Sequence, residues 1–275
     1  MVKHSAKVVI VVQARMSSTR FPGKILKPIL GKSLLSRMIE RLQMISHKAT
    51  IVIATSDSDQ DNVIEAEAQA IGVPCFRGSL NNCLDRHYQA GKQFDADVVI
   101  KIPSDCPLID PRIIDKILDY YFDHEGEYDF VNNLHPATWP DGNDVEIMTM
   151  ACIEKAWKEA TRPLEIEHTT PYIWENPDKF RIANITWDTG LDYSMSHRFT
   201  IDYPEDYEFI NRVYEELYPQ KLDFSCDDIL KLLETKPGIY QINSGYAGVN
   251  WYRNHLDELK TVSQKQTRTL TGGQV

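Results

Sequence analysis

A cluster of cations and hydroxyl groups follows the first hydrophobic run of the chain. The twelve residues QARMSSTRFPGK, from Gln13 to Lys24, contain two arginines, a lysine, three hydroxyl side chains and a glycine. Backbone N–H groups, hydroxyls and fixed cations together suit a triphosphate, whose charge needs several donors at once. The segment therefore predicts a phosphate-binding loop.

Two common phosphate-binding loops do not match this segment. A GxxxxGK[ST] loop needs a hydroxyl after the lysine, but Ile25 follows Lys24, and Ser18 stands at the first glycine position. A GxGxxG dinucleotide motif is absent from the sequence. The pattern therefore indicates a phosphate-binding loop of another kind.

Two aspartates stand where hydrophobic strands are expected to end. Asp105 follows DVVIKI, and Asp202 follows RFTI. Because ligands bind at the carboxyl ends of strands in open α/β sheets, both carboxylates are expected to face the phosphate-binding loop. Two carboxylates, phosphate oxygens and water suit Mg²⁺. A helix cap would explain either aspartate alone, and Asp110 or Asp206 is the alternative ligand.

Alternating strands and helices are expected to position these groups. Short β-branched runs alternate with helical apolar spacing, and Gly72 stands where a helix would end. This order is typical of βαβ units, so we predict an α/β fold with a mostly parallel central sheet and helices on both faces. The expected strands are 8–12, 50–54, 73–76, 97–102 and 128–131, and the expected helices are 34–45, 62–71, 82–94 and 111–122.

The pattern changes after residue 135. We interpret about 135–195 as an inserted cap, followed by a return to the main sheet, within a single domain over 1–240. Residues 241–275 form a C-terminal extension whose polar end, 261–275, is expected to be frayed or disordered. The elements expected here are a loop and a strand over 135–150, strands at 180–187 and 198–202, and helices at 151–160, 166–174, 205–218 and 225–235.

Charge and cysteine content exclude several classes of protein. Residues 1–50 hold ten of the 30 Lys and Arg and one of the 40 Asp and Glu, although the net charge is −10. This favours a polyphosphate site over general nucleic-acid binding, and a solvated basic helix face would explain Arg37 and Arg41. The sequence has no run of about 18 apolar residues, and its five cysteines lack a CxxC. We predict a cytoplasmic protein with reduced thiols and no membrane or nucleic-acid partner.

The motifs of the chain resemble the cytidylyltransferases that make CMP-activated sugars. The resemblance is to SpsF-like spore coat polysaccharide proteins and, more distantly, to CMP-Kdo synthetases, and it extends over about 7–215. It implies a Rossmann-like nucleotidyltransferase fold, CTP, Mg²⁺ and a homodimer. The segments that carry it are QARMSSTRFPGKIL (13–26), RGSLNNCLDRHYQA (77–90), KIPSDCPLIDP (101–111), WPDGNDVE (139–146), EIEHTTPYI (165–173) and RFTIDYPEDYEFI (198–210).

Residue roles follow from this resemblance at the matching positions. It implies that Arg15, Arg20 and Lys24 form a cationic clamp, and that Asp105 and Asp202 hold Mg²⁺. Fixed cations suit this role because charge develops on the phosphoryl oxygens and on the departing pyrophosphate. For Asp85, capping its own helix is an equal alternative to a ligand contact. The implied nucleotide contacts are Gln13, Ala14, Ser17, Ser18, Thr55, Asp57, Arg77, Gly78 and Asp85.

An acceptor site is implied by two further segments, DGNDVE and EIEH, which SpsF-like proteins share. Carboxylates suit sugar hydroxyls or an amino group, whereas a histidine or an arginine suits an acceptor carboxylate or phosphonate. A solvated acidic loop is the alternative, and no general base is identifiable. The candidate acceptor-binding residues are Asp141, Asp144, Glu146, Glu167, His168 and Arg198.

The sequence therefore predicts a Mg²⁺-dependent cytidylyltransferase for surface polysaccharide biosynthesis. It would transfer CMP from CTP to a sugar acid, a phosphonate or a sugar phosphate and release pyrophosphate. The alternative is a glycosyltransferase that uses a nucleotide-activated sugar, but Ser104-Asp105-Cys106-Pro107 replaces its DxD motif. A nucleotide sensor without activity is disfavoured by the retained cations and aspartates. Either a dimer interface or burial in the cap would explain Trp139, Tyr172, Trp174 and Trp187.

Overall fold

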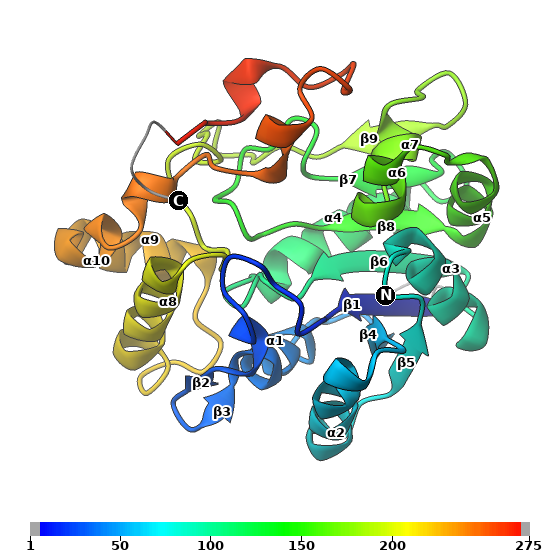
Figure 1. The fold of residues 1–275 in the computed structure, drawn as a ribbon. Helices are drawn as coiled ribbons and strands as arrows, with labels where there is room; N and C mark the ends of the chain where they lie inside the picture. The colour runs from blue at the N-terminus through cyan, green and yellow to red at the C-terminus, as the bar shows by residue number, and fades with distance from the viewer. Residues whose placement is uncertain (1–5, 271–275) are drawn as a thin grey trace.

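Seven strands form the central sheet (Figure 1). The computed structural model describes residues 6–270. The strand order is β5-β4-β1-β6-β8-β7-β9, and of these seven strands β8 alone runs antiparallel to its neighbours, which confirms the mostly parallel sheet. The strands are β1 (Val8–Gln13), β4 (Ala49–Ser56), β5 (Cys75–Gly78), β6 (Val98–Pro103), β7 (Phe130–Asn132), β8 (Glu146–Thr149) and β9 (Ile182–Asn184).

Helices cover both faces of this sheet. In β1, Ile10 and Val12 belong to one hydrophobic core, whereas Val9 and Val11 belong to the other. A strand buried on both sides reads as a continuous apolar run, as the sequence predicts. One face carries α1 (Leu34–Leu42), α2 (Asn62–Ile71), α4 (Pro111–Asp123), α8 (Pro204–Leu217) and α9 (Cys226–Thr235), and the other carries α3 (Cys83–Gln93), α5 (Met150–Glu159), α6 (Pro163–His168) and α7 (Pro171–Trp174).

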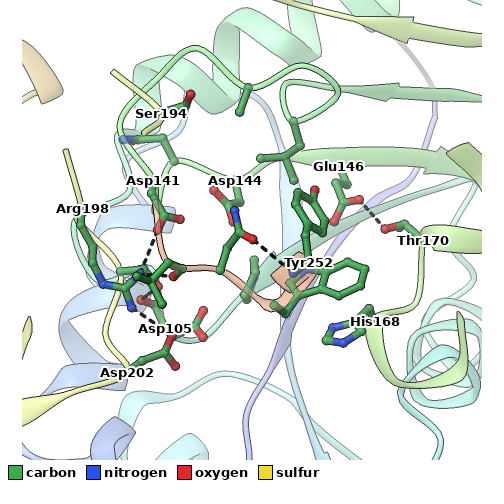
Figure 2. Close-up of a pocket in the computed structure, with 18 of the residues that line it drawn as sticks. Asp105, Asp141, Asp144, Glu146, His168, Thr170, Ser194, Arg198, Asp202 and Tyr252 are labelled. Atoms are coloured by element: carbon green, nitrogen blue, oxygen red, sulfur yellow. Dashed lines mark hydrogen bonds and ion pairs between the residues drawn. The ribbon is translucent and has the colours of Figure 1, made fainter. Parts of the chain in front are cut away.

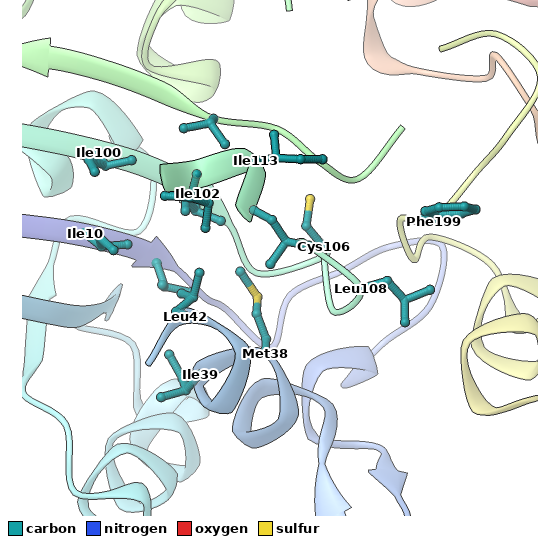
Figure 3. Packing of buried hydrophobic residues seen from close by; sticks show 14 of the residues in the cluster. Ile10, Met38, Ile39, Leu42, Ile100, Ile102, Cys106, Leu108, Ile113 and Phe199 are labelled. Carbon is teal, nitrogen blue, oxygen red and sulfur yellow. The ribbon is translucent and has the colours of Figure 1, made fainter. Parts of the chain in front are cut away.

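Helix α1 shows why the local sequence produces this packing. The Ser33 side chain accepts a hydrogen bond from the Ser36 N–H and so caps the first turn. Met38, Ile39 and Leu42 then point into the core against the strands (Figure 3), and each such burial stabilises the fold by about 1.5–3 kcal/mol. The helix therefore holds the loop before it against the sheet.

The predicted solvated basic face on this helix is wrong. Arg37 and Arg41 are buried. Arg37 donates to the carbonyls of Ile29 and Leu30, and Arg41 donates to those of Ile109 and Phe224. These buried guanidinium groups therefore connect α1 by hydrogen bonds to the segments at Ile29, Ile109 and Phe224. Ile29 belongs to a short hairpin of β2 (Pro28–Ile29) and β3 (Lys32–Ser33), which the sequence did not predict.

The segment predicted as a cap, 135–195, is continuous with the main body. It supplies β8 and β9 to the sheet, and it supplies α5, α6 and α7 to one face. The helix predicted over 166–174 is divided into α6 and α7 at Thr169. Trp139, Tyr172 and Trp174 are buried, so burial explains these three aromatic residues.

The strand predicted over 198–202 does not form. Its only strand-type pairing among the described residues is an isolated bridge between Asp141 and Arg198. The Phe199 N–H donates to the Asp141 carbonyl, and the Ile201 N–H donates to the Asp105 carbonyl. The prediction is wrong because loop carbonyls, not a neighbouring strand, accept these hydrogen bonds.

The C-terminal extension, orange to red in Figure 1, packs onto the body of the protein. Within the stretch predicted to be frayed, Val262 and Thr267 are buried, and the Arg268 N–H donates to the Gly248 carbonyl. Residues 271–275 lie outside the described residues. After α10 (Pro237–Gln241) the extension contains three 3₁₀ turns, at Ser244–Tyr246, Trp251–Asn254 and Gln264–Gln266.

Two further sequence predictions concern the whole chain. The five cysteines are free thiols in the described structure. No helix among residues 6–270 is both long enough and apolar enough to cross a membrane.

Candidate active site

A cavity of about 710 Å³ opens at the carboxyl edge of the sheet (Figure 2). Because β8 is antiparallel, its amino end, with Glu146, reaches the edge where the parallel strands end. The cavity therefore collects groups that are far apart in sequence. The predicted site residues that line it are Gln13, Arg15, Ser17, Ser18, Arg20, Lys24, Asp105, Asp141, Asp144, Glu146, Glu167, His168, Arg198 and Asp202.

The phosphate-binding loop is folded on itself. The Met16 carbonyl accepts hydrogen bonds from the N–H groups of Ser18 and Gly23, and the Met16 N–H donates to the buried Asp61 carboxylate. Gly23 has a φ of 67°, which side chains with a Cβ rarely adopt, and it caps the 3₁₀ turn Lys24–Leu26. This turn directs the lysine into the cavity.

Lys24 joins the two aspartates that the sequence predicts as metal ligands. Its Nζ atom lies 3.3 Å from Asp105 Oδ2 and 3.0 Å from Asp202 Oδ1, and it also donates to the Ile201 carbonyl. Burial alone lowers the pKa of Lys24, but Asp105 and Asp202 outweigh that effect and raise it. The ammonium group therefore stays charged between two carboxylates.

Asp202 is the most heavily paired carboxylate of the site. Its Oδ1 atom lies 2.7 Å from Arg20 Nη2, and its Oδ2 atom accepts from Arg198 Nη2 at 3.0 Å. Burial raises the pKa of Asp202, but Lys24, Arg198 and Arg20 together hold it well below its usual range. Asp202 is thus a fixed negative charge at any working pH.

Arg198 has no donors left for a ligand. Its side chain is 1% exposed. It donates to Asp141, Asp202, Asp206 and the Val249 carbonyl over 2.8–3.2 Å. The sequence predicts Arg198 as an acceptor contact, but its geometry is that of a group that positions the carboxylates around it.

The alternative metal ligands proposed from the sequence have structural partners. Asp206 is fully buried and accepts from Arg198 and from the N–H groups of Asp202 and Tyr203. Asp110 caps α4 and accepts from the Cys226 N–H. Neither carboxylate lines the cavity.

A second carboxylate group lies beside the first. The Glu146 carboxylate accepts from Lys101 Nζ and from the Thr170 hydroxyl. Burial, and next to it Asp105, raise the pKa of Asp144 to about 6, although Lys101 lowers it. Burial also raises the pKa of Asp141 well above its usual value, against the effect of Arg198. With a pKa of about 6, Asp144 is mostly ionised at pH 7, so this side of the cavity presents carboxylate oxygens as hydrogen-bond acceptors.

Gly142 allows this loop to approach the segment that carries Asp202. A Cβ at Gly142 would lie 2.7 Å from the Phe199 carbonyl carbon and 2.8 Å from the Thr200 nitrogen. Its φ of 104° is also one that L side chains rarely adopt. Only glycine lets the two backbones pack this closely.

A strained turn presents the polar groups of α6. Thr169 is fully buried with φ 75° and ψ −53°, and the Thr170 N–H donates to the His168 carbonyl. This is the rare γ-turn with positive φ, whose strain is typical of functional sites. Glu167 lies 2.5 Å from Arg15 Nη2, and His168 stacks on Trp251 at 3.7 Å.

His168 cannot act as the cation that the sequence predicts for an acceptor anion. Burial, and next to it Lys101, lower the pKa of His168 to about 3. The ring is neutral at pH 7, so it contributes a planar face and hydrogen-bonding nitrogens.

Six predicted nucleotide contacts do not line the cavity. Arg77 donates to Glu65, Asn62 and two backbone carbonyls, and Asp85 accepts from Trp157 and Gln89. Any nucleotide role for these residues stays a prediction. The six are Ala14, Thr55, Asp57, Arg77, Gly78 and Asp85.

Sequence reasoning missed several residues that line the cavity. Lys101 is a charged residue within the hydrophobic run DVVIKI, and a charge in a buried strand could have indicated a site residue. The aromatic residues had no such signal, because their segments show no periodic pattern. The missed residues are Lys101, His135, Trp174, Trp251 and Tyr252.

The donor set fits the predicted magnesium ion. Asp105 and Asp202 converge on one cationic atom, Lys24 Nζ, so both can face a single positive charge. Two carboxylates with phosphate oxygens and water are the ligands Mg²⁺ prefers. No cluster of three or more metal-ligating side chains occurs in the described part of the chain, so substrate oxygens would have to complete the coordination.

Fold and cavity together define a nucleotidyltransferase: a mostly parallel sheet with a cationic loop and two carboxylates at its carboxyl edge. Comparison with known proteins gives the family. The family model described as Cytidylyltransferase matches residues 9–227. The chain belongs to the cytidylyltransferase family.

Three relatives show how far the similarity extends. SpsF of Bacillus subtilis (strain 168), a spore coat polysaccharide biosynthesis protein, is 30% identical over 235 residues, 84% of this chain and 95% of that protein. The 3-deoxy-manno-octulosonate cytidylyltransferase of Zea mays is 36% identical over 124 residues, 41% of this chain and 38% of that protein. A solved cytidylyltransferase from Leptospira borgpetersenii serovar Hardjo-bovis (strain JB197) has a TM-score of 0.81 and 35% identity, covering 86% of this chain and 97% of that chain.

Proposed function

We propose that this protein transfers CMP from CTP to the hydroxyl of a sugar acid and releases pyrophosphate. The observation that carries the proposal is the convergence of Arg20 and Lys24 on Asp202, in a cavity with carboxylates on its other side. The names of two relatives support a sugar acid as acceptor and a role in surface polysaccharide synthesis.

The cationic loop would stabilise the reacting phosphates. In the transfer, the acceptor hydroxyl loses its proton to solvent and its oxygen forms a bond to the α-phosphorus. The bond from the α-phosphorus to the oxygen that bridges to the β-phosphate breaks, and this oxygen leaves with the pyrophosphate. Negative charge then grows on the α-phosphoryl oxygens and on the pyrophosphate. Arg15 and Arg20 are held in place before the reaction, so they stabilise that charge without reorganisation.

Asp105 and Asp202 would hold Mg²⁺ when the nucleotide binds. The ion would supply charge neutralisation on the phosphate oxygens. Lys24 then has the freedom to turn from the two carboxylates toward the phosphates, because its remaining partner among residues 6–270 is the Ile201 carbonyl. Arg198 keeps Asp202 oriented throughout, since it bonds the Oδ2 atom that faces away from Lys24.

The test is pyrophosphate release from CTP with a panel of sugar acids that includes 3-deoxy-manno-octulosonate. We expect turnover in the wild type and its loss in Arg20→Met and Asp105→Asn. Arg212→Met is the matched control, because Arg212 is exposed and forms an ion pair with the surface residue Glu215. Retained turnover in both site variants would refute the site. Hydrolysis of a nucleotide-sugar without use of any triphosphate would point to the glycosyltransferase instead.

Cytoplasmic location and a homodimer remain predictions from the sequence. Light scattering of the purified protein measures the second. A mass of twice the 31.6 kDa chain is expected.

A further inference from the structure

Residues 243–268, here named the C-terminal strap, form one wall of the cavity. The family model matches residues 9–227, so the strap lies outside the residues that the model matches. It contributes both backbone and side chains to the cavity (Figure 2). The strap residues that line it are Val249, Asn250, Trp251, Tyr252, Asn254, His255, Lys265 and Gln266.

The strap is anchored to the catalytic side of the site. Arg198 Nη1 donates to the Val249 carbonyl at 2.8 Å. The Asn243 amide donates to the Arg198 carbonyl and to Asp206, so the first turn of the strap joins the same network. Any movement of the strap would therefore reach the groups that orient Asp202.

A second anchor fixes the far end of the strap. The buried Glu175 carboxylate accepts from the backbone N–H groups of Lys260 and Thr261 and from the Thr261 hydroxyl, at 2.6–2.9 Å. Inside the strap, the Asn250 amide donates to the Gln266 carbonyl at 2.8 Å. Two anchors and this internal bond make the strap a preformed wall.

The strap brings an aromatic surface into the cavity. The Trp251 ring stacks on His168 at 3.7 Å with an angle of 12°, and it lies 4.6 Å from Tyr252. His135 stacks beside Trp174 at 4.3 Å on the neighbouring wall. Burial lowers the pKa of His135 to about 4, so both histidines are neutral near pH 7. The Trp251 and Tyr252 rings meet at 64°, so the surface is an uncharged aromatic corner.

Hydrogen-bonding carboxylates lie next to this surface. Asp141 and Asp144 line the cavity near Tyr252, as Figure 2 shows. Lys101 pairs with Glu146 and Arg198 pairs with Asp141, whereas Lys265 of the strap is exposed and also lines the cavity. An acceptor would thus meet carboxylates and aromatic rings together with the ammonium group of Lys265.

This combination fits a cyclic, polyhydroxylated molecule. A pyranose ring has C–H faces that pack on aromatic rings, and its hydroxyls donate to carboxylates. A short linear phosphate ester has no such face to pack against the aromatic rings.

We propose that the C-terminal strap makes the acceptor site selective for cyclic sugars, with the sugar ring seated in the corner between Trp251 and Tyr252. The proposal rests on the cytidylyltransferase activity proposed above. Trp251 and Tyr252 are the specificity-determining residues, and Arg198 is a positioning residue that couples the strap to Asp202.

The experiment compares acceptors and variants at saturating CTP, with pyrophosphate release as the readout. The acceptors are cyclic sugar acids, beginning with 3-deoxy-manno-octulosonate, and glycerol 3-phosphate as the linear probe. The variants are Trp251→Ala, Trp251→Phe and the control Trp157→Ala, whose ring stacks on Tyr88 and does not line the cavity. CTP affinity is measured separately by calorimetry, without acceptor.

We expect Trp251→Ala to raise KM for the cyclic acceptor at least tenfold, with kcat changed less than threefold and CTP affinity within twofold. Trp251→Phe, which keeps an aromatic face, should recover much of this loss, and Trp157→Ala should behave as wild type. The alanine variant is used only if its unfolding temperature matches that of Trp251→Phe; otherwise Trp251→Leu replaces it.

Three outcomes would overturn the proposal while CTP binding persists. The first is an unchanged KM in the Trp251 variants, and the second is turnover with glycerol 3-phosphate only. The third is no turnover with any cyclic acceptor. Loss of CTP binding in the wild type would instead overturn the proposed function itself.

Discussion

Replacing Arg198 tests whether this residue positions the neighbouring carboxylates or contacts the acceptor directly. Arg198→Met removes the guanidinium while keeping most of its volume. Arg198→Lys keeps the charge, but an ammonium has three donors in place of five and cannot span the same partners. Both variants leave the surrounding carboxylates in the protein interior.

The expected magnitude follows from the burial of those partners. Arg198 makes five hydrogen bonds, and Asp206, which accepts two of them, is fully buried. Removing one member of a buried ion pair costs about 3–5 kcal/mol. Since 1 kcal/mol corresponds to about 2–4 °C in a protein near this size, Arg198→Met should lower the unfolding temperature by roughly 6–20 °C. Arg198→Lys should lose about half as much.

The assay is thermal unfolding by circular dichroism, together with pyrophosphate release. Arg212→Met is the control, because an exposed ion pair such as Arg212–Glu215 contributes less than about 1 kcal/mol. A positioning residue predicts a loss of stability and a lower kcat in both Arg198 variants. An Arg198→Lys variant with wild-type stability and only a raised KM for the acceptor would refute the reasoning.

The remaining predictions concern catalysis, packing and pH. Lys24→Met should lower kcat by about 10²–10³, whereas Lys27→Met should stay close to wild type in the pyrophosphate assay, because Lys27 lies over the Phe21 ring outside the cavity. In urea unfolding, Gly142→Ala should destabilise the fold by about 2–4 kcal/mol and Gly126→Ala by about 1–2 kcal/mol. Both glycines have a positive φ, but a Cβ would meet another backbone segment at Gly142 and open space at Gly126. Equal losses in the two variants would contradict the close backbone packing at Gly142. Burial lowers the pKa of His87 to about 3, so the folded state resists a proton that the unfolded chain takes up near its ordinary pKa. His87 should therefore lower the free energy of unfolding by about 2 kcal/mol as the pH drops from 7 to 5. In urea unfolding, His87→Asn should lose about 2 kcal/mol less than the wild type over the same pH range.

Much of the fold follows from local signals in the sequence. The run 8–12 is β-branched throughout because both faces of β1 are covered. Gly72 ends α2 with a φ of 82°, as its position predicts. Many of the residues that line the cavity could also be predicted from the sequence, because polar groups at the carboxyl ends of parallel strands meet at one edge of the sheet.

Other features depend on contacts between distant segments and have no local signal. The run 198–202 has the composition of a strand, yet loop carbonyls take its N–H groups. The turn at Thr169 places a β-branched residue at positive φ, which no propensity favours. The sequence around Arg198 gives no sign that this cation is paired. In the folded protein Asp206 and the Val249 carbonyl lie beside it and accept its hydrogen bonds.

Nucleotide binding tests the central claim most directly. Calorimetric titration of CTP, UTP, ATP and GTP, with and without Mg²⁺, needs no acceptor and reports on the cationic loop and the two aspartates alone. The account predicts that CTP binds selectively and that Mg²⁺ strengthens the binding. If no triphosphate binds and a nucleotide-sugar does, the assignment of the 13–24 loop to a triphosphate is contradicted.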